Sequence, residues 1–72
     1  MSLAYHAAWM LSLSPFDRRR YLAGLLAVPI VDEGGAPTGR TIAMLSRADA
    51  ERLTGLVDDD RALARYAEGD AV

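Results

Sequence analysis

His6 is the side chain best suited to acid–base chemistry, because it is the only histidine in the chain and histidine titrates near neutral pH without help from its surroundings. A general base or a metal site also needs partners for the imidazole. The sequence contains no cysteine and no second histidine to supply them. We therefore expect no catalytic residue, no metal site and no bound cofactor, and a histidine that is packed or lies on the surface.

The residues around His6 include aromatic side chains that could stack on a ligand. Read at a period of two, Tyr5, Trp9 and Leu11 share one face of their segment, as the buried face of a strand does. Such rings pack in a core or an interface more often than they stack on a small molecule. Trp9 is therefore an interface candidate and, with His6, a ligand-binding candidate.

A second place for a contact is the glycine-rich stretch in the middle of the chain. Two apolar runs, Val28–Val31 and Thr41–Leu45, flank the segment Asp32–Gly39. Three of the six glycines and one of the three prolines lie in that segment, which is the pattern of a β-hairpin with an open tip. Asp32 and Thr38 in this tip complete the set of ligand-binding candidates.

The sequence contains two short runs of opposite charge: three arginines at Arg18–Arg20 and three aspartates at Asp58–Asp60. The arginines can bind phosphate or an acidic partner, or form a solvated helix face. We also expect that in a symmetric dimer each arginine run could meet the other subunit's aspartates. The interface candidates are therefore Tyr5, Trp9, Arg18, Arg19, Arg20, Asp58, Asp59 and Asp60.

Composition limits the class of protein. The 72 residues make one domain, 51% of them are hydrophobic and there is no cysteine, so the core is small and has no disulfide to support it. The net charge of −2 argues against general nucleic-acid binding. All eight basic residues are arginine, which is typical of a GC-rich genome. No apolar run is long enough to span a bilayer and the start lacks a basic signal-peptide region, so we expect a cytoplasmic protein.

The elements that position these residues follow from capping and periodicity. The segment Ser2–Ser14 alternates as a strand does, although its alanines and leucines also suit a helix with Leu3, Ala7, Met10 and Leu11 as a stripe. Hydroxyl caps predict helices over Pro15–Ala27, with Phe16, Leu22, Leu25 and Leu26 inward, and over Arg47–Val57, with Ala50, Leu53, Leu56 and Val57 inward. A helical turn at Arg61–Ala67 and a short strand at Asp70–Val72 would end the chain.

With the first segment as a strand, the order becomes an abbreviated ferredoxin-like βαββαβ fold. In this α+β arrangement the two helices would cover one face of a small antiparallel sheet. The opposite face would need a second copy of the chain as a cover.

The chain from residue 25 onward resembles the YCII-related family of small dimeric α+β barrel proteins. The similar residues are Leu25–Pro29, Thr38–Ala43, Ser46 before an alanine-rich helix, Asp58–Asp60, and Tyr66 before Val72. The resemblance implies a βαββαβ fold, a homodimer and a pocket between sheet and loops. It also implies a histidine in the first helix and a proline after the acids. The predicted first helix has no histidine and Arg61 follows the acids, so no catalytic role is carried over.

The expected function is association: a homodimer, or a small subunit of a larger protein assembly. One alternative is a YCII-like small-molecule binder or enzyme, with a pocket near His6, Trp9 and the tip. Another is a small regulator or antitoxin that uses Arg18–Arg20 on nucleic acid, which the net charge disfavours.

Overall fold

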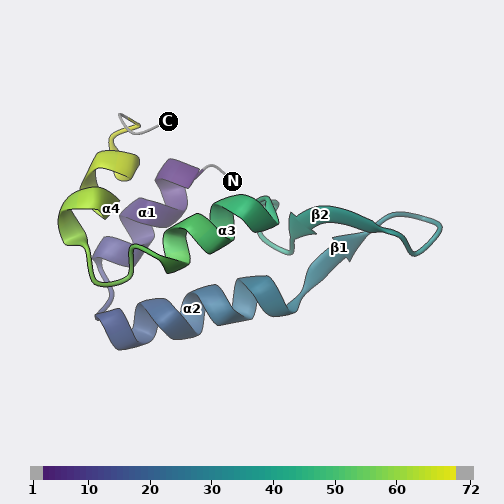
Figure 1. Ribbon diagram of the computed structural model, residues 1–72, viewed down its shortest axis with the longest axis horizontal. Coiled ribbons are helices and arrows are strands. Elements are labelled where there is room, and N and C mark those ends of the chain that lie inside the picture. The colour runs from purple at the N-terminus through teal and green to yellow at the C-terminus, as the bar shows by residue number, and fades with distance from the viewer. Residues whose placement is uncertain (1–2, 70–72) are drawn as a thin grey trace.

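The chain runs through two helices, a hairpin and two further helices in the computed structural model, which describes residues 3–69. Its elements are α1 (Leu3–Leu11), α2 (Pro15–Ala27), β1 (Pro29–Val31), β2 (Pro37–Thr41), α3 (Arg47–Thr54) and α4 (Asp60–Ala67) (Figure 1). This is an α+β protein with the order α-α-β-β-α-α, and the predicted βαββαβ ferredoxin-like fold is wrong. The strand predicted at Asp70–Val72 lies outside the described residues.

The predicted and observed folds differ mainly because residues 3–11 form helix α1 and not a strand. Ala7 and Met10 are fully buried, as the helical stripe required, whereas Tyr5 and Trp9 are half-exposed. A strand here would need a neighbouring strand to satisfy its backbone hydrogen bonds, whereas a helix satisfies them internally. The neighbour is instead helix α4, which packs along α1 from the other end of the chain.

Helix boundaries follow the capping residues closely. The hydroxyls of Ser14 and Ser46 each accept a hydrogen bond from the backbone N–H three residues on, at the starts of α2 and α3. Asp59 caps α4 with its carboxylate in the same way. Helix α2 has the predicted bounds, whereas α3 ends at Thr54, earlier than the predicted Val57.

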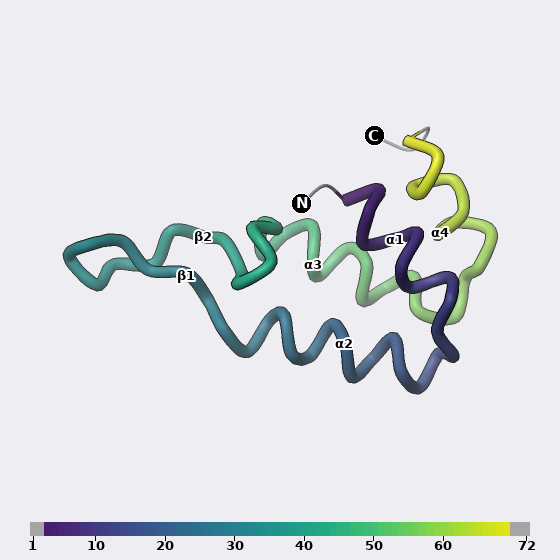
Figure 2. Tube along the Cα trace, turned by 180° about the vertical axis from the view of Figure 1, so that it is seen from behind, coloured from purple at the N-terminus to yellow at the C-terminus, as the bar shows by residue number. Residues whose placement is uncertain are grey.

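The core lies between the two helix pairs, α1 against α4 and α2 against α3 (Figure 2). Most of the inward positions predicted for α2 and α3 are buried or partly buried. Phe16 is the exception: its side chain was predicted to point inward and is 66% exposed. The buried apolar residues are Ala7, Met10, Leu22, Leu25, Leu45, Ala50, Leu53, Val57 and Leu63.

The hairpin projects from one end of the helices as an arm, for which we take residues 28–42 (Figure 1). Its strands pair antiparallel, with Pro29 opposite Thr41 and Ile30 opposite Arg40. Residues 31–40 are all exposed, so the arm accounts for much of the elongated shape, 40 × 25 × 16 Å.

The second strand lies earlier in the chain than expected. It was predicted at Thr41–Leu45, but β2 covers Pro37–Thr41 and the residues after it form a turn. In this turn the N–H of Thr41 donates to the carbonyl of Leu45, and the N–H of Met44 donates to the carbonyl of Thr41. The turn carries the chain from the arm back to α3 and brings Ala43 against the helices.

No helix within residues 3–69 is both long and apolar enough to cross a membrane.

Candidate functional site

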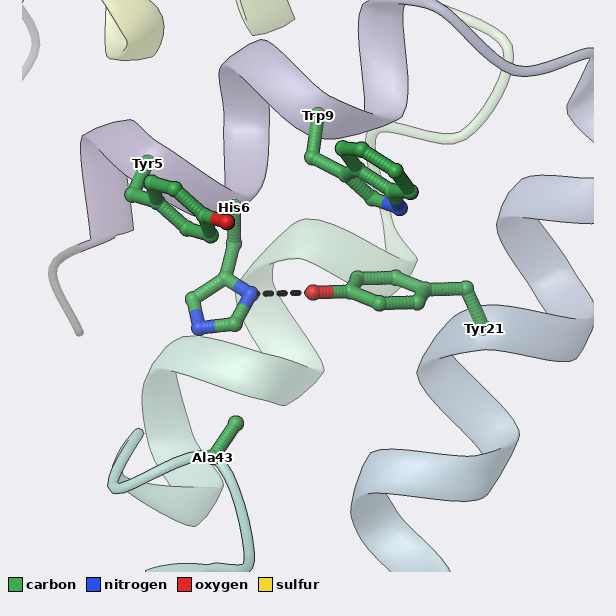
Figure 3. A pocket seen from close by; sticks show the side chains of 5 residues that line it. All are labelled: Tyr5, His6, Trp9, Tyr21 and Ala43. Atoms are coloured by element: carbon green, nitrogen blue, oxygen red, sulfur yellow. Dashed lines mark hydrogen bonds between the residues drawn. The ribbon is translucent and has the colours of Figure 1, made fainter.

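An aromatic pocket of about 360 Å³ opens between α1, α2 and the turn that follows β2. Figure 3 shows its walls: side chains of α1 and α2 approach from two sides, and the turn closes it below. The residues that line it are Tyr5, His6 and Trp9 from α1, Tyr21 from α2, and Ala43 from the turn. The pocket therefore brings together two of the four predicted ligand-binding residues.

His6 forms the inner wall of the aromatic pocket, with only 1% of its surface exposed. Its Nδ1 is hydrogen-bonded to the hydroxyl of Tyr21, and its ring packs edge-on against Tyr5 (Figure 3). Within residues 3–69, Nε2 has no partner that meets ordinary hydrogen-bond geometry. The backbone of Ala43 favours the protonated ring.

The electrostatics of this pair favour two neutral groups at neutral pH. Burial, the largest cause, lowers the pKa of His6 below its ordinary value, the positive charge of the N-terminus lowers it further, and the backbone of Ala43 only partly opposes these two effects. Burial also raises the pKa of Tyr21, with Tyr5 acting in the same direction. A neutral imidazole and a neutral phenol share one hydrogen between Nδ1 and the hydroxyl oxygen.

This arrangement suits binding better than proton transfer. Nε2 of His6 is buried, and Nδ1 is already bonded to Tyr21, so a substrate atom cannot reach either nitrogen in this conformation. The lining residues include no carboxylate, arginine, serine or threonine. What the pocket offers is aromatic surface on several sides.

The other two predicted ligand-binding residues lie in the arm and do not line the pocket. Asp32 accepts hydrogen bonds from the N–H groups of Gly34 and Ala36 through one carboxylate oxygen, both at 2.9 Å. The hydroxyl of Thr38 donates to the carbonyl of Ile30 at 2.7 Å. Both side chains therefore shape the tip of the arm, so a single pocket formed by His6, Trp9 and the tip does not occur in this structure.

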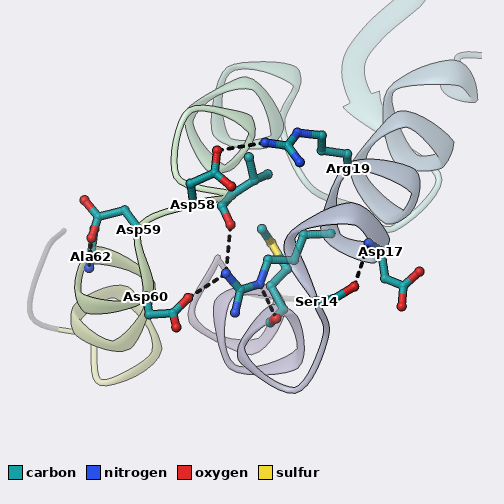
Figure 4. A network of polar contacts seen from close by, with 10 residues as sticks. Ser14, Asp17, Arg19, Asp58, Asp59, Asp60 and Ala62 are labelled. Carbon is teal, nitrogen blue, oxygen red and sulfur yellow. Dashed lines mark hydrogen bonds and ion pairs between the residues drawn. The ribbon is translucent and has the colours of Figure 1, made fainter.

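Arg18 was predicted to lie in an interface between proteins, but it is buried within the chain, with only 3% of its surface exposed. Its Nε donates to the carbonyl of Met10 at 2.7 Å, and a terminal nitrogen donates to the carbonyl of Val57 at 2.8 Å. The same nitrogen pairs with the carboxylate of Asp60 at 2.6 Å (Figure 4). The guanidinium is thus a structural link between segments distant in sequence.

The remaining charges of the two runs also have partners within the chain. Arg19 pairs with Asp58 at 2.7 Å (Figure 4), and Arg20 lies over the ring of Phe16. Asp59 is the cap of α4. The charge complementarity that the sequence suggested between two subunits is therefore used inside one chain.

Sequence reasoning missed Tyr21, Ala43 and the burial of Arg18. A signal for Arg18 was present, because it precedes Leu22 and Leu25 by four and seven positions and so lies on the buried face of α2. Nothing local marks Ala43, since its place in the pocket depends on the turn after the arm.

Residues 3–69 contain no cluster of three or more histidine, cysteine or acidic side chains that could hold an ion.

Comparison with known proteins adds no relative: no family model, curated protein or solved structure matches the chain.

Proposed function

We propose that the protein is a non-catalytic association module of the cytoplasm, acting as a homodimer or as a small subunit of a larger assembly. The observation that carries this proposal is the arm. It is an ordered two-stranded hairpin whose residues 31–40 are all exposed. Two strands alone are marginally stable in water, so a hairpin held out from the core is suited to gaining further contacts from a partner.

The arm is held in one conformation by its own hydrogen bonds and not by burial. The carboxylate of Asp32 holds the tip turn, and the hydroxyl of Thr38 ties β2 to β1. A preorganised surface loses less conformational entropy on binding than a flexible one. The arm therefore meets one requirement of a specific contact element.

Contacts through the open edges of the arm are disfavoured. The N–H of Ile42 donates to the carbonyl of Val28, so these two residues form a hydrogen-bonded pair of the hairpin. Hydrogen-bonded and non-hydrogen-bonded pairs alternate along an antiparallel ladder. The next pair, Pro29 and Thr41, is therefore non-hydrogen-bonded, and its backbone groups point away from the partner strand. Proline has no N–H there, and Pro37 supplies none on the other strand. The N–H of Thr41 is already bonded to the turn. These features protect sheet edges from strand addition.

A partner would instead meet the side chains on the faces of the arm. Val28 and Ile42 lie directly across the base of the hairpin from each other and are 47% and 61% exposed. Val31 is 54% exposed. Apolar side chains on a preorganised element are the usual centre of a protein contact.

Sedimentation velocity with Ile42→Ser tests the proposal. We expect the wild-type protein to dimerise, and at about 100 μM a dimer of micromolar affinity would be almost fully formed. Ile42→Ser should shift the protein to monomer. Phe16→Ser is the matched control, because Phe16 is equally exposed but lies at the start of α2, away from the arm.

A wild-type monomer at that concentration would exclude the homodimer. Native mass spectrometry of the tagged protein from its own host would then decide between a subunit role and none. One defined partner that Ile42→Ser loses and Phe16→Ser retains would support the subunit role. A monomer without such a partner would overturn the proposal.

A further inference from the structure

The aromatic pocket lies apart from the arm tip and has no part in the proposed association, yet it has the size and walls of a small-molecule site. Its volume of about 360 Å³ lies at the lower end of the range for ligand pockets, which are mostly apolar and few per protein. A volume of this size accommodates one ring or two fused rings. We propose that it binds a single flat, uncharged aromatic group of about the size of indole.

The shape of the ligand follows from the aromatic lining. In Figure 3 the indole of Trp9 comes from α1 and the ring of Tyr21 from α2, and both rings line the pocket. A flat ring offers a face to either aromatic side chain, and stacking on aromatic side chains is how proteins hold flat bases in nucleic-acid sites. A bulky non-planar group would contact one ring and lose the other.

The charge of the ligand follows from the lining. None of the five lining residues carries a full charge at neutral pH, because burial lowers the pKa of His6 and keeps its ring neutral. A charged ligand would lose its hydration without gaining an ion pair from these five side chains. An organic cation is the one charged rival, since ring faces attract cations.

The inner and outer walls of the aromatic pocket differ in burial, and this difference favours binding. The inner wall is fixed, because His6 is buried and hydrogen-bonded to Tyr21. The outer wall is exposed: Tyr5 and Trp9 each have half of their surface in solvent. A ligand between the two walls would remove apolar surface from water, which is favourable, without rearranging the core.

An NMR titration with indole tests the proposal, because Trp9 is the only tryptophan and gives a single indole N–H signal. Isotope-labelled protein should show saturable shifts of that signal and of the amides of Tyr5, Tyr21 and Ala43. Ala43→Leu fills the pocket and should weaken binding by at least about tenfold. Ala8→Leu is the matched control, since Ala8 is exposed on the same helix as Trp9 and does not line the pocket.

Three further results test the proposal against a cation site and against the absence of binding in the pocket. Tetramethylammonium should produce no shift; if it moves the same signals at lower concentration than indole does, the pocket is a cation site and the proposal is wrong. Absence of saturable shifts with indole, or full affinity in Ala43→Leu, would also overturn it. If Ala43→Leu does not fold, Trp9→Ala at its half-exposed position replaces it, and ligand-observed saturation transfer should then be lost.

Discussion

His6 links three parts of the molecule at the scale of one residue. The ring belongs to α1, hydrogen-bonds Tyr21 of α2, and lies against the turn that carries Ala43. Burying an imidazole in this setting favours its neutral form, since the charged form would lose hydration without an acidic partner among the pocket residues. His6, which the sequence marked as the residue best suited to acid–base chemistry, therefore packs inside the fold. Its protonation affects the free energy of unfolding of the protein.

The stability of the protein should fall as the pH is lowered through the ordinary pKa of histidine, about 6.5. The folded-state pKa of His6 is lowered, so between the two pKa values the unfolded chain binds the extra proton and the free energy of unfolding decreases. The decrease should level off below the folded pKa. Urea unfolding at a series of pH values measures this.

The variant His6→Gln keeps a polar side chain of similar reach but removes the titration. Its unfolding free energy should change less with pH over the same interval, because the imidazole whose pKa is lowered by burial is absent. The same slope in both proteins would show that another group is responsible.

At the scale of the element, glycine has opposite roles in α2 and in the arm. Gly24 lies inside α2 and is exposed, whereas Gly39 in β2 has a φ of +79°. A Cβ atom at either position would meet nothing within 4 Å. The two sites therefore differ in backbone conformation and not in available space.

Gly24→Ala should raise the free energy of unfolding by about 0.5–1 kcal/mol, because alanine loses less backbone entropy in a helix. Gly39→Ala should lower it by about 1–2 kcal/mol, because a Cβ is strained in the left-handed region. Urea denaturation of both variants beside the wild type measures the two changes, and a change of the same sign in both would contradict this interpretation.

At the scale of the whole molecule, Arg18 connects the two helix pairs. Its guanidinium in α2 bonds the carbonyl of Met10 near the end of α1, the carbonyl of Val57 after α3, and Asp60 at the start of α4. The start of α2 and the start of α4, which these contacts join, lie at the end of the molecule away from the arm (Figure 1). Arg18 thus supplies the donor for the carbonyl of Val57 and a second donor for the carbonyl of Met10, which also accepts the N–H of Leu13.

Arg18→Met should lower the free energy of unfolding by about 1–3 kcal/mol, because it leaves the buried carbonyl of Val57 without a donor and removes one of the two donors to the carbonyl of Met10. Arg19→Met is the matched control and should cost less than about 1 kcal/mol, since the pair with Asp58 is exposed. Equilibrium unfolding in urea compares them. Equal losses in the two variants would mean that the Arg18 contacts are not structural links.

The local features of the fold were the predictable part. Ser14 and Pro15 start α2, Ser46 starts α3, and the hairpin between them follows from the glycines and prolines. Each of these signals acts over a few residues, so the sequence alone contains them. Of the candidate site, His6 and Trp9 were found because their types stand out, whereas Tyr21 and Ala43 come from other elements and were missed.

The amino-acid sequence by itself determined the caps, the bounds of α2, the apolar faces of α2 and α3 and the presence of a hairpin. Only the tertiary structure decided that residues 3–11 form a helix, because the pattern fits both states and the choice depends on α4 as a partner. It also decided that Arg18 is buried and that Tyr21 meets His6, since both results arise when segments far apart in the chain pack together. Periodicity reports which faces are apolar, and only packing determines what those faces meet.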